Sequence, residues 1–229
     1  MKTAGKSNEI TAIPQLLAAL DVAGCIVTID ALGCQKQIAA DIKQGKGDYV
    51  LALKENHPKT YAAVAALFPK DNLPEAEYTE ITKDNGRIEK REAWLYKEVS
   101  WFSGKEDWAG LQAFGCVRST RTIKEKTSVE CRYFLTSLAN TAHFARSVRA
   151  HWGIENKLHW CLDVAFREDY ARNRMDHSAA NLAVLRKITL NLIRLEPTEK
   201  YEKQKFSLGR KRLYASYNPE FLLTILLNL

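Results

Sequence analysis

The sequence lacks both a hydrophobic run long enough to cross a membrane and a leader that resembles a signal peptide. Every apolar stretch is shorter than the roughly 18 residues that a spanning helix needs, and residues 1–8 are polar with no apolar core. We therefore expect a cytoplasmic protein with no membrane partner. Glycine (11) and proline (6) are scarce among the 229 residues, and 46% are hydrophobic, which is typical of a globular chain with a sizeable core.

Cysteine is also sparse, and its pattern excludes two classes of small domain. The five cysteines are odd in number, scattered along the chain and form no Cys-x-x-Cys pair. That spacing fits neither a disulfide framework nor a zinc ribbon. Cys25 and Cys161 stand among apolar residues, and we expect both to be buried thiols.

Positive charge is in excess, with a net charge of +7 and a sequence pI near 9.1. Nine basic residues against three acidic ones lie between Arg186 and Arg212, so this segment carries most of the excess. A basic balance favours a polyanionic partner. A basic run is more often a solvated face, so it supports nucleic-acid binding only weakly by itself.

The first third of the chain alternates helix and strand. Apolar spacing predicts helices, and short β-branched runs predict buried strands between them. A parallel pair of strands with helices between them is α/β architecture. The predicted elements are a helix over Glu9–Leu20, a strand over Gly24–Asp30, a helix over Cys34–Gln44, a strand over Asp48–Lys54 and a helix over His57–Phe68.

From about Lys70 to Ala139 the pattern becomes β-rich. Short β-branched and aromatic runs are separated by turn signals such as Asp84-Asn85-Gly86. The helical period then returns, predicting helices over Thr141–Trp160, Ser178–Leu195 and Pro219–Leu227. We divide the chain into residues 1–69, a β-rich insertion over 70–139, and a helical part over 140–229.

Two carboxylates stand where an α/β protein places its chemistry. Asp30 ends a buried strand, at the carboxyl edge of the sheet. Glu155 lies in the middle of an aromatic-rich helix. An acid at the end of a strand and one on a helix across that edge can share Mg²⁺ ions, which prefer oxygen ligands. Taken as isolated residues, they are more often a turn cap and a surface acid.

Four segments in order carry a family resemblance. They are Lys6-Ser-Asn-Glu-Ile-Thr-Ala-Ile-Pro14, Thr28-Ile-Asp-Ala-Leu-Gly-Cys-Gln35, Tyr49-Val-Leu-Ala-Leu-Lys54 and His151-Trp-Gly-Ile-Glu-Asn-Lys-Leu-His-Trp160, the last continuing through Leu162-Asp-Val-Ala-Phe-Arg-Glu-Asp169. Over nearly the whole chain the sequence resembles the DDE transposases of bacterial insertion sequences. The branch that it resembles most includes the H-repeat-associated proteins linked to Rhs elements.

The resemblance implies a ribonuclease-H-like core with three acidic metal ligands, interrupted by a β-rich insertion. The family's second Asp falls on Asp30 and its Glu on Glu155. Mg²⁺ or Mn²⁺ is the implied cofactor, and double-stranded DNA, as transposon ends and target, is the implied partner. The implied reaction is attack of water, and then of a DNA 3′-hydroxyl, on phosphodiesters.

Two departures from the family pattern matter. The family's first Asp and the first three core strands have no counterpart before Lys6, so we expect an N-terminally truncated, inactive fragment. The alternative is a non-catalytic DNA-binding or regulatory remnant. A Tyr-x₂-Arg-x₃-Glu-x₆-Lys signature found in related enzymes survives only in Glu155. The missing strands should expose a sheet edge, which predicts marginal stability unless a homodimer or an N-terminal fragment covers it.

Several further residues are candidates for DNA or metal contact. Four acids and histidines recur every fourth residue (His151, Glu155, His159 and Asp163), so a zinc hydrolase is a competing hypothesis, although His-Glu-x-x-His is missing. His151 and His159 could instead touch phosphates or orient Glu155. Our other candidates for phosphate contact are Arg167, Arg172 and Arg174. The alternating Arg87, Glu89 and Arg91 could contact DNA or form a salt-bridged strand face.

Overall fold

The computed structural model describes residues 9–84, 86–154, 158–173, 175–196 and 206–227. The chain forms two compact units, Met1–His151 and Trp152–Leu229. Among the described residues, no helix is long and apolar enough to cross a membrane.

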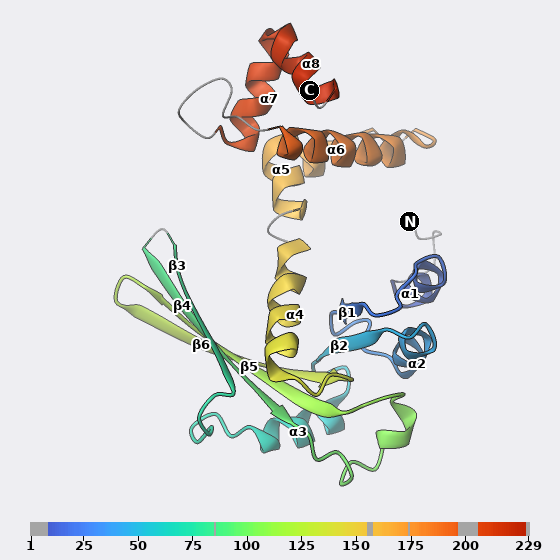
Figure 1. The fold of residues 1–229 in the computed structure, drawn as a ribbon, viewed down its shortest axis with the longest axis vertical. Helices are drawn as coiled ribbons and strands as arrows, with labels where there is room; N and C mark the ends of the chain where they lie inside the picture. Colours follow the sequence, from blue (N-terminus) through green and yellow to red (C-terminus); the bar gives the residue numbers. More distant parts are fainter. Residues whose placement is uncertain (1–8, 85, 155–157, 174, 197–205, 228–229) are drawn as a thin grey trace. The chain divides into compact units, whose positions relative to one another are not determined.

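The first unit is built on a six-stranded sheet with the strand order β1-β2-β6-β5-β4-β3. β1 and β2 are parallel, and each other neighbouring pair is antiparallel (Figure 1). The strands are β1 (Ile26–Ile29), β2 (Asp48–Leu53), β3 (Tyr78–Asp84), β4 (Arg87–Tyr96), β5 (Ala113–Ile123) and β6 (Lys126–Thr136). The helices of this part are α1 (Glu9–Ala18), α2 (Lys36–Gln44), α3 (Pro58–Leu67), the short η1 (Lys105–Asp107) and α4 (Thr141–Ile154), whose last three residues belong to the second unit.

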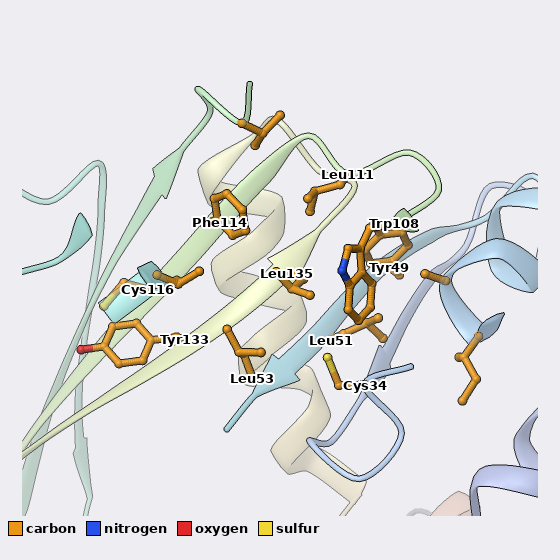
Figure 2. Packing of buried hydrophobic residues seen from close by; sticks show 14 of the residues in the cluster. Cys34, Tyr49, Leu51, Leu53, Trp108, Leu111, Phe114, Cys116, Tyr133 and Leu135 are labelled. Atoms are coloured by element: carbon orange, nitrogen blue, oxygen red, sulfur yellow. The ribbon is translucent and has the colours of Figure 1, made fainter. Parts of the chain in front are cut away.

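Side chains alternate between the two faces of the sheet, and a separate apolar cluster covers each face. On one face, α2 and α3 pack through Ile38, Ile42 and Val64 against side chains of β2, β5 and β6. Figure 2 shows part of this cluster, to which Trp108, Cys34 and Tyr49 belong. On the other face, α4 packs through Phe144 and Val148 against Val50, Ala93, Leu95, Val117 and Phe134.

Polar side chains join the start of β2 to the end of β6. The hydroxyl of Thr136 donates to the carbonyl of Tyr49 at 2.7 Å, and the amide of Tyr49 donates to the hydroxyl of Ser137 at 2.9 Å. The Ser137 hydroxyl donates in turn to Asp48 at 2.8 Å. Lys43 also binds that carboxylate at 2.8 Å. Burial alone would raise the pKa of Asp48, but the bonds from Lys43 and Ser137 lower it overall.

The second unit consists of helices. They are α5 (Trp160–Phe166), the short η3 (Glu168–Tyr170), α6 (Ser178–Leu195), α7 (Leu208–Tyr217) and α8 (Pro219–Leu227). Leu190 and Ile193 of α6 are buried against α5 and α8. The buried ammonium of Lys211 on α7 donates to the carbonyls of Ile193 and Glu196, so it satisfies acceptors that the end of α6 leaves open.

The structure confirms the mixed α/β class and most of the expected elements. The β-rich segment is not a separate sheet, because β6 pairs with β2 and all six strands form one sheet. The sheet is therefore not reduced to two parallel strands, although β1 pairs only with β2 among the described strands. Cys161 is buried as expected, whereas Cys25 is exposed, because it lies in the turn before this edge strand.

Candidate active site at the carboxyl edge of the parallel strands

Asp30 directly follows β1 and its side chain holds the turn that comes next. The β-branched run Ile26–Ile29 forms the strand. Oδ1 of Asp30 accepts the backbone amides of Leu32 at 3.1 Å and Gly33 at 3.3 Å. This is the Asx-turn geometry that aspartate favours after a strand. The residue is exposed, and no hydrogen bond to Oδ2 is found within the described residues.

Gly33 keeps this turn close to the strand that precedes it. A Cβ at position 33 would lie 2.4 Å from Cγ2 of Ile29 and 2.9 Å from Cδ1 of Ile13. Only a residue without a side chain allows the backbone to approach β1 and α1 so closely. The turn is therefore packed against β1 and α1, and this packing holds the backbone that carries the Asp30 carboxylate in place.

The loop after β2 lies at the same edge of the sheet. Ile29 is paired with Leu51, so Asp30 lies beside Ala52 and on the same face of the sheet. Lys54 follows two residues later, and the alternation of side chains places it on that face as well. It is exposed and has no salt bridge within the described residues. An acid and a cation thus follow neighbouring parallel strands.

Two side chains of the same loop contact the turn that follows Asp30. The side-chain amide of Asn56 donates to the carbonyl of Ala31 at 2.5 Å. Nε2 of His57 lies 2.6 Å from the carbonyl oxygen of Cys34. The loops after β1 and β2 are therefore joined by hydrogen bonds in addition to the pairing of their strands.

Helix α4 docks on the face of the sheet that carries Asp30. Phe144 is fully buried and lies over Gly115 of β5, where a Cβ would come within 2.3 Å of the ring. Near the other end of the helix, Nδ1 of His151 lies 3.1 Å from the hydroxyl oxygen of Thr28 on β1. Thr28 and Asp30 share a face because they are two residues apart. The structure thus ties α4 to the strand that ends at Asp30.

The other predicted site residues fall outside this unit or outside the described residues. Glu155 and Arg174 belong to the residues that the structure does not describe. His159, Arg167 and Arg172 belong to the second unit, and all three are exposed. Arg167 ends α5 with a φ of 50°, in the left-handed region. Of the predicted residues, the structure brings together His151 and the strand that leads to Asp30.

The arginines of the outer sheet are bound to glutamates. Arg91 lies 2.7 Å from Glu89, which also binds Arg87, and Arg118 lies 3.0 Å from Glu92. Both glutamates are buried, at 6% and 7% exposure. Burial alone would raise the pKa of Glu89, but the hydrogen bond from Arg87 and the charges of its arginine neighbours lower it overall. The structure therefore shows the salt-bridged strand face, although Glu89 and Arg91 are largely buried where an exposed face was expected.

The sequence reasoning did not single out Lys54, Asn56 or His57 as site residues. A signal was present, because Lys54 ends the second predicted parallel strand, as Asp30 ends the first, and Asn56 and His57 come soon after it. The carboxyl ends of parallel strands meet at one edge, so residues after the second strand belong to the same neighbourhood. What the sequence could not show is which of them turn back toward Asp30.

The chemistry of Asp30 fits one ligand of a hard divalent ion. Its exposed carboxylate presents oxygen, the donor that Mg²⁺ and Mn²⁺ prefer. Within the described residues, no group of three or more His, Cys, Asp or Glu side chains could hold a metal ion. Glu155, the other carboxylate that the sequence singles out, lies outside the described residues.

Comparison with known proteins gives consistent matches over the chain. Residues 1–192 match the family described as "Transposase DDE domain". The chain is 41% identical over 202 residues to "Putative transposase YncI" of Escherichia coli O157:H7, covering 85% of this chain and 52% of that protein. It is 36% identical over 237 aligned positions to "H repeat-associated putative transposase YhhI" of Escherichia coli K12, covering 99% of this chain and 61% of that protein. The chain thus spans between about half and three fifths of these relatives.

Proposed function

The chain belongs to the DDE transposase family, and from this premise we propose that Asp30 and Glu155 are two of the metal-binding carboxylates of an insertion-sequence transposase. The resemblance to the H-repeat-associated branch is confirmed by the relatives. The observation that carries the proposal is the position of Asp30, exposed at the carboxyl end of β1, with α4 bound to the same strand through His151 and Thr28. Glu155 follows His151 by four residues, about one helical turn in sequence.

In this proposal the residues of the chain hold and orient the reacting groups. Bound Mg²⁺ or Mn²⁺ ions would neutralise phosphate charge and activate the attacking oxygen during phosphodiester cleavage and strand transfer. Asp30 and Glu155 would hold these ions through carboxylate oxygens. The amides of Leu32 and Gly33 fix one oxygen of Asp30, which limits how the carboxylate can turn.

The fold supports a ribonuclease-H-like core in this chain. We take residues 1–69 and 140–229 as parts of that core, with the β-rich segment over 70–139 inserted between its second Asp and its Glu. The two parallel strands, the acid after the first of them and the helix packed beside them are the parts that support this reading. We take the core as incomplete, because β1 pairs only with β2 among the described strands.

DNA contacts in this proposal come from lysine, arginine and histidine side chains of the chain. Lys54 lies on the face of Asp30, and we add it to His151, His159, Arg167, Arg172 and Arg174 as candidates for phosphate contact. The partner is double-stranded DNA, as transposon ends and target, and a homodimer is one assembly that would cover the edge of β1.

Metal binding tests the proposal directly. Mn²⁺ titration followed by electron paramagnetic resonance should detect an ion that is lost in Asp30→Asn and in Glu155→Gln. Asp21→Asn is the matched control. Asp21 also accepts a backbone amide in its own turn, from Ala23 at 3.1 Å, but it is not one of the proposed metal-binding carboxylates. Equal Mn²⁺ binding by the wild type, Asp30→Asn and Glu155→Gln would refute the proposed metal site.

Cleavage tests the activity of these 229 residues by themselves. The family uses three acids and the chain offers two of them, so we expect no metal-dependent nicking of supercoiled plasmid DNA. Nicking that requires Mg²⁺ or Mn²⁺ and disappears in Asp30→Ala would show that the two acids suffice. Metal-independent DNA binding without any Mn²⁺ site would instead favour the non-catalytic DNA-binding remnant.

A further inference from the structure

The loop after β2 clamps the turn after Asp30 at two points. Asn56 donates to the carbonyl of Ala31 and His57 to the carbonyl of Cys34, at 2.5 and 2.6 Å. Between these two points lie only Leu32 and Gly33, whose amides bind Oδ1 of Asp30. The clamp therefore encloses the two donors that orient the carboxylate.

The bond from His57 requires a hydrogen on Nε2 and fixes the direction of the ring. A carbonyl oxygen can only accept, so Nε2 of His57 carries the hydrogen. The ring packs edge-on against Trp108, with centroids 5.7 Å apart and an angle of 74°. Trp108 belongs to the apolar cluster drawn in Figure 2. The ring is thus held by the core, and it holds the end of the Asp30 turn.

Asn56 makes its contact from a different position. Its residue is exposed, so truncation of its side chain removes a hydrogen bond and little packing. The same loop begins at Lys54, directly after β2, and α3 starts at Pro58. The clamp is therefore short and anchored at both ends by regular structure, which favours a fixed geometry.

We propose that Asn56 and His57 are positioning residues, which keep the Asp30 carboxylate in the orientation that a divalent ion requires. The inference rests on the proposed metal site. Hydrogen bonds behind a ligand commonly affect metal affinity by about 10- to 100-fold without touching the ion. Asn56 and His57 act here through the backbone amides of Leu32 and Gly33.

The test uses Asn56→Ala, His57→Ala and the rescue variant His57→Gln, whose side-chain amide can replace the Nε2 donor. Asn72→Ala is the control, because Asn72 is another exposed loop asparagine of the first unit. Hydrogen exchange by nuclear magnetic resonance reports the Leu32 and Gly33 amides, and Mn²⁺ titration reports the site. We expect about tenfold faster exchange and about tenfold weaker Mn²⁺ binding in both alanine variants. His57→Gln and Asn72→Ala should resemble the wild type.

The two readouts separate this inference from the proposed function. If the wild type binds no Mn²⁺, the metal site fails, while faster exchange in Asn56→Ala still demonstrates the clamp. Wild-type Mn²⁺ affinity in Asn56→Ala, with or without faster exchange, would overturn the positioning role. Should His57→Ala fail to fold because it also loses its contact with Trp108, Asn56→Ala and His57→Gln keep the test decisive.

Discussion

Nδ1 of His151 lies 3.1 Å from the hydroxyl oxygen of Thr28, across 123 residues of sequence. This bond links the helix that precedes Glu155 to the strand that precedes Asp30. In the sequence, Asp30 lies two residues after Thr28, and Glu155 lies four residues after His151. If the acids share an ion, this bond limits how far α4 can move from β1.

The coupling between these two residues can be measured. His151→Ala and Thr28→Val should each destabilise the first unit, and a double-mutant cycle by urea unfolding should give an interaction energy of about 0.5–1.5 kcal/mol. Ser147 is the control, because its hydroxyl binds the His143 carbonyl of its own helix. Ser147→Ala and Thr28→Val should add within about 0.5 kcal/mol. If the effects of His151→Ala and Thr28→Val on stability also add, that result would contradict a hydrogen bond between the two side chains.

Gly115→Ala should lift α4 from the sheet. The added Cβ would meet the Phe144 ring at 2.3 Å, and both residues are buried, so the helix or the ring must move. We expect a loss of about 1–3 kcal/mol in the free energy of unfolding. Gly153→Ala on the same helix is the contrast, since its Cβ would have nothing within 4 Å. That variant should stabilise the helix by up to about 1 kcal/mol.

Partial recovery in Gly115→Ala/Phe144→Leu would show that the two side chains compete for one space. Urea unfolding of the single and double variants measures this. An unchanged stability of Gly115→Ala would mean that α4 does not pack at Gly115.

The outer sheet should lose stability in acid because of Glu89. Its pKa in the folded protein is lowered, as Arg87 and Arg91 outweigh the effect of burial. A group with a lowered folded pKa contributes stability above the unfolded value of about 4.3. That contribution is lost as the pH falls through the folded pKa. Urea midpoints between about pH 6 and pH 3 should therefore fall less in Glu89→Gln than in the wild type.

Glu89→Gln should also be less stable than the wild type near neutral pH, because Arg91 loses its ion pair at 2.7 Å and keeps the longer one to Glu80 at 3.6 Å. The control is Glu125→Gln in the exposed turn between β5 and β6, which should keep the wild-type pH profile. Identical acid profiles for Glu89→Gln and the wild type would refute the assigned role.

Lys54→Gln should weaken DNA binding at low salt. Each phosphate contact releases counterions, so the slope of log K against log salt should shrink by about 0.9 for duplex DNA. Fluorescence anisotropy with a labelled duplex at several salt concentrations measures this slope. Lys97→Gln removes an equal charge after β4, away from the parallel strands, and should leave the slope unchanged. The same slope change in both variants would mean a general charge effect.

The spacing of apolar and β-branched residues predicted several helices and strands well. The apolar spacing of Ser178–Leu195 predicted the bounds of α6, and the β-branched run before Asp30 predicted β1 to within two residues. The expected helix over Thr141–Trp160 is helical where the structure describes it, as α4 up to Ile154 and again from Leu158 onward. Residues 155–157 lie outside the described residues, so the single helix stays a prediction.

Long-range pairing was the part that local pattern could not give. The β-rich segment was predicted as an insertion, but nothing in its alternation specifies that Leu135 pairs with Leu51. That choice depends on which strand edge is left open and on polar side chains such as Ser137 and Thr136. The same holds for the site, where the positions of Asn56 and His57 depend on the path of a loop.

The pairing of β2 with β6 has a consequence for synthesis on the ribosome. Val50 and Leu53 are made 86 and 80 residues before their partners Thr136 and Tyr133. Contacts so distant in sequence form slowly, and an unpaired strand edge is prone to associate with other chains. Until β6 emerges, the newly made β1–β2 pair has one long edge without its native neighbour. The nascent chain is therefore most vulnerable to aggregation after β2 is complete and before Thr136 has been added.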